Sequence, residues 1–212
     1  AVKDKNERKD AEIELEIPNM DQPPRLFPGY NLLFAGTMNE DESTQSLSDK
    51  VVDRANILRF AAPKKIKDGQ AEGQVEDPKA LSQSTWNSWI TASSSVESEP
   101  VVKASLEKMV DLMRDFKRPF GHRLGRAMLA YSANYPRVEG SRWPEDAIAD
   151  QVEMRLLPKL RGVDVDMVSG QFSELRSFVE RDLGDDALAQ AIGDSLDLAE
   201  GTGQFVWNGA TR

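Results

Sequence analysis

The chain of 212 residues contains no cysteine and only one histidine. Without cysteine, disulfide bonds, thiolate metal sites and cysteine nucleophiles are excluded, and His122 alone cannot form a multi-histidine metal site. No run of about 18 consecutive apolar residues exists that would predict a membrane-spanning helix. The charged N-terminal residues also lack the apolar core of a signal peptide. We therefore expect a cytoplasmic protein with no membrane partner and no metal site.

Basic residues are fewer than acidic ones: the chain has 27 lysines and arginines against 36 aspartates and glutamates, so its net charge is −9. No basic stripe is present that could coat a nucleic-acid backbone, although a local basic loop is compatible with this balance. The composition, 39% hydrophobic and 30% charged, is typical of a globular chain. Its length suits one domain or two small ones.

The N-terminal part carries strand patterns. Residues 11–17 alternate between apolar and acidic side chains, which predicts a half-buried edge strand. Residues 31–36 are continuously apolar and predict a strand buried on both faces. A helix is expected at about 46–55 and a second short strand at 57–60. Polar residues follow the buried strand, at the position where α/β proteins place their chemistry.

The remainder of the chain is helical by its periodicity. Residues 63–79 are polar and glycine-containing, which predicts a linker. Beyond them, apolar residues recur at spacings of three and four in several stretches between 101 and 198, enough for a small bundle of four or five helices. The expected fold is an α/β remnant over 1–62, the linker, and an all-α domain over 80–212, so that the chain is predominantly helical.

Two phosphate-binding motifs are missing. The sequence has no G-x-x-x-x-G-K-[ST] loop and no apolar strand ending in Asp-Glu that could hold Mg²⁺. A self-sufficient nucleotide site is therefore not expected within these residues.

Four motifs nevertheless occur in an order that resembles a known family. They are Gly-Thr-Met-Asn (36–39) followed by Asp-Arg-Ala-Asn (53–56), Phe-Gly-His-Arg (120–123), Leu-Pro-Lys-Leu-Arg-Gly (157–162), and Gly-Gln-Phe-Val-Trp (203–207). Together they resemble the second half of an AAA+ nucleotide hydrolase of the McrB-like branch. In that family the phosphate loop and the Asp-Glu strand would precede Ala1, so we expect this chain to be the C-terminal part of a longer protein.

The resemblance implies a function. The complete protein would hydrolyse ATP or GTP with Mg²⁺ at the subunit interfaces of a homo-oligomeric ring, which the resemblance implies is a hexamer. Its cycle would translocate or remodel DNA for a partner nuclease in restriction or anti-phage defence. Two alternatives stay open: a non-catalytic split module that supplies its arginine and lid to another chain, and a MoxR-type ATPase that remodels proteins.

Two catalytic residues follow from the motif positions. Asn39 matches the sensor that orients the attacking water or the γ-phosphate, although an Asn here could merely cap a turn. Arg54 matches the arginine finger presented to a neighbouring subunit. Its alternative role is a surface ion pair with Asp49 or Asp53, and Arg59 is a weaker candidate for the finger.

The nucleotide-binding lid arginine has two candidates. Arg123 matches the aromatic-x-x-Arg motif, and Arg126 lies one helical turn further on. His122 is expected to be a packing or surface residue. Two further features suit ordinary structural roles: the acidic residues 40–42 suit a solvated turn, and Trp86 and Trp89 suit core or interface packing more than base stacking.

Overall fold

The computed structural model describes residues 9, 11–29, 32–39, 47–61 and 80–210. They divide into two compact units, Ala1–Ser46 and Leu47–Arg212, which are considered separately. The described chain is predominantly helical, as predicted, and its one sheet has two strands. The predicted linker over 63–79 lies outside the described residues.

The first unit contains a short antiparallel hairpin. Strand β1 (Ile13–Glu14) pairs with β2 (Arg25–Leu26), with Ile13 opposite Leu26 and Glu14 opposite Arg25. The Arg25 guanidinium lies 3.0 Å from the Glu14 carboxylate, and both side chains are about half exposed. The edge strand predicted at 11–17 is therefore present in shortened form, with β2 as its partner.

The doubly buried strand expected at 31–36 is not formed in the described residues. Residues 32–39 are neither helix nor strand, and the side chains of Leu33 and Phe34 are 74% and 81% exposed. A strand needs neighbours for its backbone N–H and C=O groups, and the described residues offer none here. The strand–helix–strand unit predicted from the apolar run is accordingly not seen.

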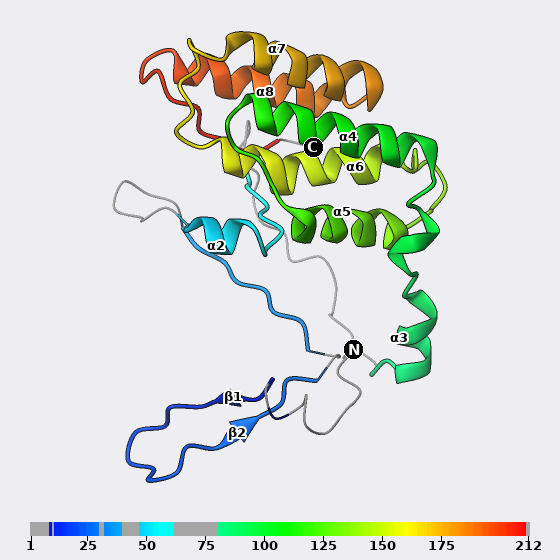
Figure 1. Cartoon of the computed structure of the whole chain (residues 1–212), viewed down its shortest axis with the longest axis vertical. Coiled ribbons are helices and arrows are strands. Elements are labelled where there is room, and N and C mark those ends of the chain that lie inside the picture. The colour runs from blue at the N-terminus through cyan, green and yellow to red at the C-terminus, as the bar shows by residue number, and fades with distance from the viewer. Residues whose placement is uncertain (1–8, 10, 30–31, 40–46, 62–79, 211–212) are drawn as a thin grey trace, which may run out of the picture. The chain divides into compact units, whose positions relative to one another are not determined.

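The second unit is built from helices (Figure 1). Helices α4 and α6 lie between the pair α7–α8 and helix α5, and α6 runs into a π-helical turn, η2, and a 3₁₀ turn, η3. The elements are α2 (Asp49–Val52), α3 (Gln83–Trp89), η1 (Ser93–Ser95), α4 (Pro100–Asp115), α5 (His122–Asn134), α6 (Glu145–Gln151), η2 (Val152–Leu156), η3 (Leu157–Leu160), α7 (Ser169–Ser177), η4 (Phe178–Asp182) and α8 (Asp186–Ala199).

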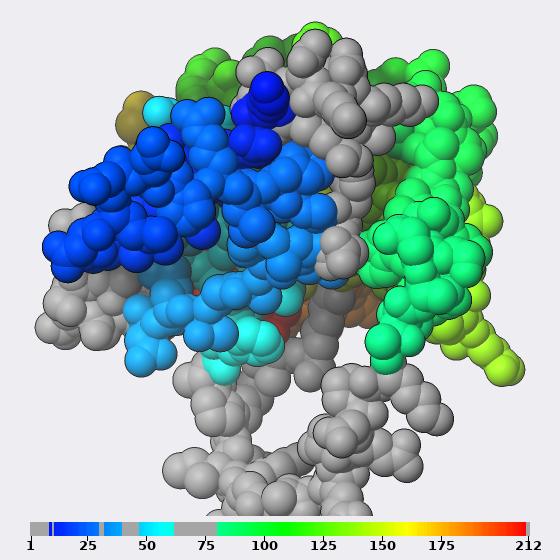
Figure 2. Space-filling view, turned by 90° about the horizontal axis from the view of Figure 1, so that it is seen from below, coloured from blue at the N-terminus to red at the C-terminus, as the bar shows by residue number. Residues whose placement is uncertain are grey.

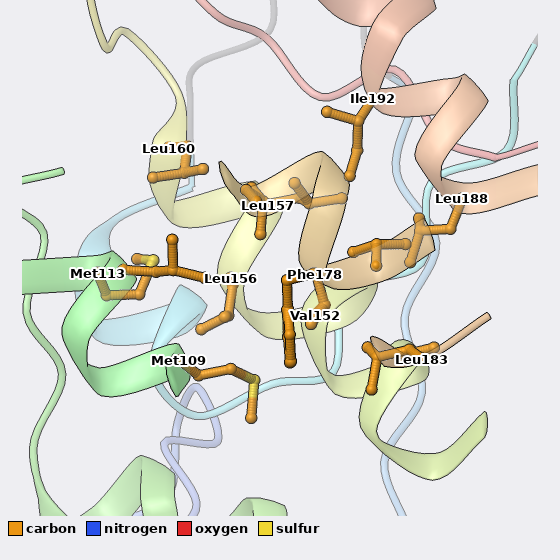
Figure 3. Close-up of a cluster of buried hydrophobic side chains, with 14 of the residues drawn as sticks. Met109, Met113, Val152, Leu156, Leu157, Leu160, Phe178, Leu183, Leu188 and Ile192 are labelled. Atoms are coloured by element: carbon orange, nitrogen blue, oxygen red, sulfur yellow. The ribbon is translucent and has the colours of Figure 1, made fainter. Parts of the chain in front are cut away.

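The hydrophobic core lies among α4, η2, η3, η4 and α8 (Figure 3). Figure 3 shows side chains from these elements pointing toward one another, including Met109 of α4, Leu156 of η2 and Ile192 of α8. These are positions from the predicted helical stripes, and all three are buried. One stripe residue is an exception, because Leu198 at the end of α8 is 69% exposed.

The C-terminal tail completes this core. Phe205 and Trp207 are buried, and the tail pairs with the loop after η3 through Phe205 N–H to Val163 O and Gly162 N–H to Phe205 O, each at 2.8 Å. The Phe172 ring lies 4.8 Å from Phe116 and 4.7 Å from Phe205 between ring centroids. The tail is therefore a structural part of the helical unit.

Helix α3 lies at the surface of this unit. None of its residues is buried, and in Figure 2 the green atoms of this part of the chain lie uncovered on the face that is shown. The Trp86 and Trp89 rings lie 6.4 Å apart, and Trp89 is 57% exposed, so of the two predicted roles Trp89 does not pack in the core and the interface role stays a prediction. Within the described ranges, no helix is both long and apolar enough to cross a membrane.

Candidate functional site

The proposed finger Arg54 lies two residues beyond the end of α2 at Val52. Ser48 precedes the helix, and the Arg54 N–H continues its last turn by donating to Val51 O at 3.0 Å. The Arg54 side chain is exposed. Among the residues described, it makes no ion pair or hydrogen bond through its guanidinium. Helix α2 is shorter than predicted, yet it presents Arg54 to solvent.

The neighbouring residues of Arg54 face the helical unit instead. Val52 is buried, and Asp53 Oδ1 accepts a hydrogen bond from Lys159 Nζ of η3. The Lys159 side chain is 11% exposed and that of Asp53 is 45% exposed. Asp53 was one of the two carboxylates that could have paired with Arg54, and its partner in the structure is Lys159.

A second cation lies near Asp53. Arg155 of η2 is buried, and desolvation by burial lowers the pKa of its guanidinium, while the charge of Asp53 acts in the opposite direction. Its Nε and Nη1 have no hydrogen-bond partner among the described residues, and neither has the buried amide of Gln151, one turn earlier. Such π-helical turns occur frequently at functional sites. In the sequence, the only sign of this cluster is that the polar residues Gln151 and Arg155 stand among the apolar residues of the helical stretch 147–157.

Residues beyond Arg54 are held by the helical unit as well. The Ile57 N–H donates to Met154 O at 3.2 Å, and Arg59 Nη1 donates to Trp207 O at 2.5 Å. Phe60 forms a parallel bridge with Ala210. The strand predicted at 57–60 is thus reduced to one bridge, and Arg59 is half-buried at an anchor point.

Close backbone approach at the bridge requires glycine at position 209. Gly209 has φ +90°, a conformation that L side chains rarely adopt, and a Cβ there would overlap the carbonyl oxygen of Arg59. The backbone of the tail can therefore approach the backbone of Arg59 this closely only because position 209 has no side chain.

The two lid candidates lie on α5. Arg126 lines an open groove of about 560 Å³ between α4 and α5, whereas Arg123 is exposed outside its lining. The groove is lined by apolar side chains such as Phe120 and by charged or polar ones from both helices, namely Glu107 and Asp111 of α4 and His122 and Arg126 of α5. His122 is exposed, as expected for a surface residue. The structure thus gives the two arginines different surroundings.

Asn39 belongs to the first unit, whereas Arg54, Arg123 and Arg126 belong to the second. Its side chain is exposed. The acidic residues 40–42 that follow it lie outside the described residues. Within the part of the chain that the structure describes, no three His, Asp or Glu side chains are grouped to hold a metal ion.

Comparison with known proteins identifies the class of the helical unit. Residues 75–196 match the family described as a domain of unknown function (DUF8727), and this match covers more than half of the chain. The chain therefore belongs to that family. No curated protein and no solved structure matches the sequence.

Proposed function

We propose that this chain is the C-terminal part of an AAA+ nucleotide hydrolase of the McrB-like kind. In this proposal a homo-oligomeric ring hydrolyses ATP or GTP with Mg²⁺ and uses the cycle to translocate or remodel DNA with a partner nuclease in the cytoplasm. The observation that carries the proposal is Arg54: it is exposed at a helix end while the residues on both sides of it are anchored to the helical unit.

An arginine finger needs this combination of exposure and fixed backbone. Its guanidinium must reach the phosphates of a neighbouring subunit, where it neutralises charge on the transferring phosphoryl group. Arg59, the other candidate, instead donates to Trp207 O. Asn39 would orient the attacking water, and Arg123 or Arg126 would contact phosphate from the lid. The residues present fit these auxiliary roles, whereas the phosphate loop and the Mg²⁺ ligands must come from elsewhere.

Turnover of Mg·ATP and Mg·GTP by the natural polypeptide that carries this sequence tests the proposal. We expect at least one nucleotide to be hydrolysed, with turnover per subunit rising with protein concentration because the finger acts between subunits. Stimulation by DNA would favour the restriction function over MoxR-type protein remodelling. Absence of turnover with both nucleotides, with and without DNA, contradicts the hydrolase proposal and leaves the non-catalytic split module.

The two lid arginines can be separated by paired substitutions. We expect Arg123→Ala to weaken nucleotide binding or lower turnover more than Arg126→Ala, because the motif places Arg123 at the sensor position. Binding is measured by titration with a fluorescent ATP or GTP analogue, and turnover by phosphate release. The reverse ranking would transfer the role to Arg126 and make the groove between α4 and α5 part of the nucleotide site.

A further inference from the structure

The segment 47–61 is anchored to the helical unit at three points on different elements. Asp53 pairs with Lys159 of η3, the Ile57 N–H donates to Met154 O of η2, and Phe60 bridges to Ala210 of the tail. These contacts lie within one compact unit. A four-residue helix is too short to be stable alone, so the position of α2 depends on these anchors.

The Asp53 anchor combines burial with opposite charge. Lys159 is nearly buried, Arg155 is buried, and Asp53 is the carboxylate that acts on both. Loss of its charge would leave two cations in a region of low dielectric without that compensation, which is costly. Removing Asp53 should therefore expel Lys159 toward water and release the end of α2.

Arg54 follows Asp53 in the turn that continues α2, where the N–H groups of Arg54 and Ala55 both donate to Val51 O. Successive residues of a helix point about 100° apart, so Asp53 can face the helical unit while Arg54 faces solvent. The orientation of the Arg54 side chain therefore depends on the contact that Asp53 makes with the helical unit.

We propose that Asp53 and Lys159 are positioning residues that fix Arg54 to the helical unit, so that the arginine and the helices move as one body. The catalytic part of this inference rests on the proposed function of Arg54. The anchoring part stands on the contacts alone and is measured without nucleotide.

The Ile57 amide reports the anchoring. Its N–H is bonded to Met154 O across the interface between the segment and η2, so its hydrogen exchange measures opening of that interface. In the natural polypeptide we expect Asp53→Asn and Lys159→Met to accelerate this exchange about tenfold, since a half-buried charged contact is lost. Lys159→Arg keeps the positive charge, so the Ile57 amide in this variant should exchange as slowly as in the wild type. Unchanged exchange of the core amides of α4 shows that the variants are folded.

The pair Lys108–Glu174 provides a matched control, because it also joins a lysine to a carboxylate between two elements of the helical unit. Lys108→Met should leave Ile57 exchange unchanged. Equal exchange in wild type, Asp53→Asn and Lys159→Met overturns the anchoring, whatever the hydrolysis rate.

The catalytic part is read from kcat and KM. With Arg54 mispositioned, we expect Asp53→Asn to lower kcat at least about tenfold while KM changes by less than about threefold. If Arg54→Ala lowers turnover and Asp53→Asn does not, the positioning role is wrong. If Arg54→Ala itself has no effect, the finger assignment fails, while the exchange result still decides the anchoring.

Discussion

Arg54→Ala is expected to lower nucleotide hydrolysis at least about tenfold and up to about 10³-fold or more in the natural polypeptide, with nucleotide affinity nearly unchanged. The reason is that a guanidinium in the proposed finger role stabilises charge on the transferring phosphoryl group in the transition state and adds little to ground-state binding. Steady-state phosphate release and a nucleotide titration on the same preparation measure the two quantities.

Arg181→Ala is the matched control for this experiment. Arg181 is also exposed and lies on η4, away from the segment 47–61 in sequence and on a different element. It should hydrolyse nucleotide at the wild-type rate. Arg54→Lys should recover little activity, because an ammonium lacks the planar fork of the guanidinium. Wild-type turnover in Arg54→Ala would remove the finger assignment.

Phe172→Ala is expected to destabilise the helical unit by about 3–5 kcal/mol, the range for truncating a buried phenylalanine. The Phe172 ring is 1% exposed and lies against both Phe116 of α4 and Phe205 of the tail. Truncation leaves a cavity and removes two aromatic contacts at once. Urea unfolding followed by circular dichroism gives the free energy of unfolding.

Phe60→Ala controls for the loss of an aromatic side chain. Phe60 is 90% exposed, so its truncation should change the free energy of unfolding by no more than about 0.5 kcal/mol. A similar small change in Phe172→Ala would mean that the tail and α4 are not joined through this ring.

The helical part of the fold was accessible to prediction because its signal is local. In α4, Val102, Met109 and Leu112 repeat at helical spacing and all are buried, since one helical face is enough to specify which side packs. The strand at 31–36 was predicted by the same logic and does not form in the described residues. Its apolar run encodes burial, but burial of a strand also requires partner strands, which composition and spacing do not supply.

The candidate site was predictable only in part. Arg54 was predicted from its motif, and the structure shows that its side chain is exposed, while its role stays a prediction. The contact between Asp53 and Lys159 joins residues 106 positions apart, and no periodicity reports such a pairing. Arg155 stood out only as a polar residue within an apolar stretch, because its burial depends on how η2 packs.

The bond from Arg59 to Trp207 spans 148 positions, and this has a consequence for synthesis. A ribosome adding about 5–20 residues per second makes Trp207 roughly 7–30 seconds after Arg59. During that interval Arg59 cannot donate to Trp207 O, and the close backbone contact between Arg59 and Gly209 cannot form. The segment that carries Arg54 therefore gains its contact with Trp207 only after the helices of the unit have been made, so a product truncated before Trp207 would lack this anchor while it keeps the contact between Asp53 and Lys159.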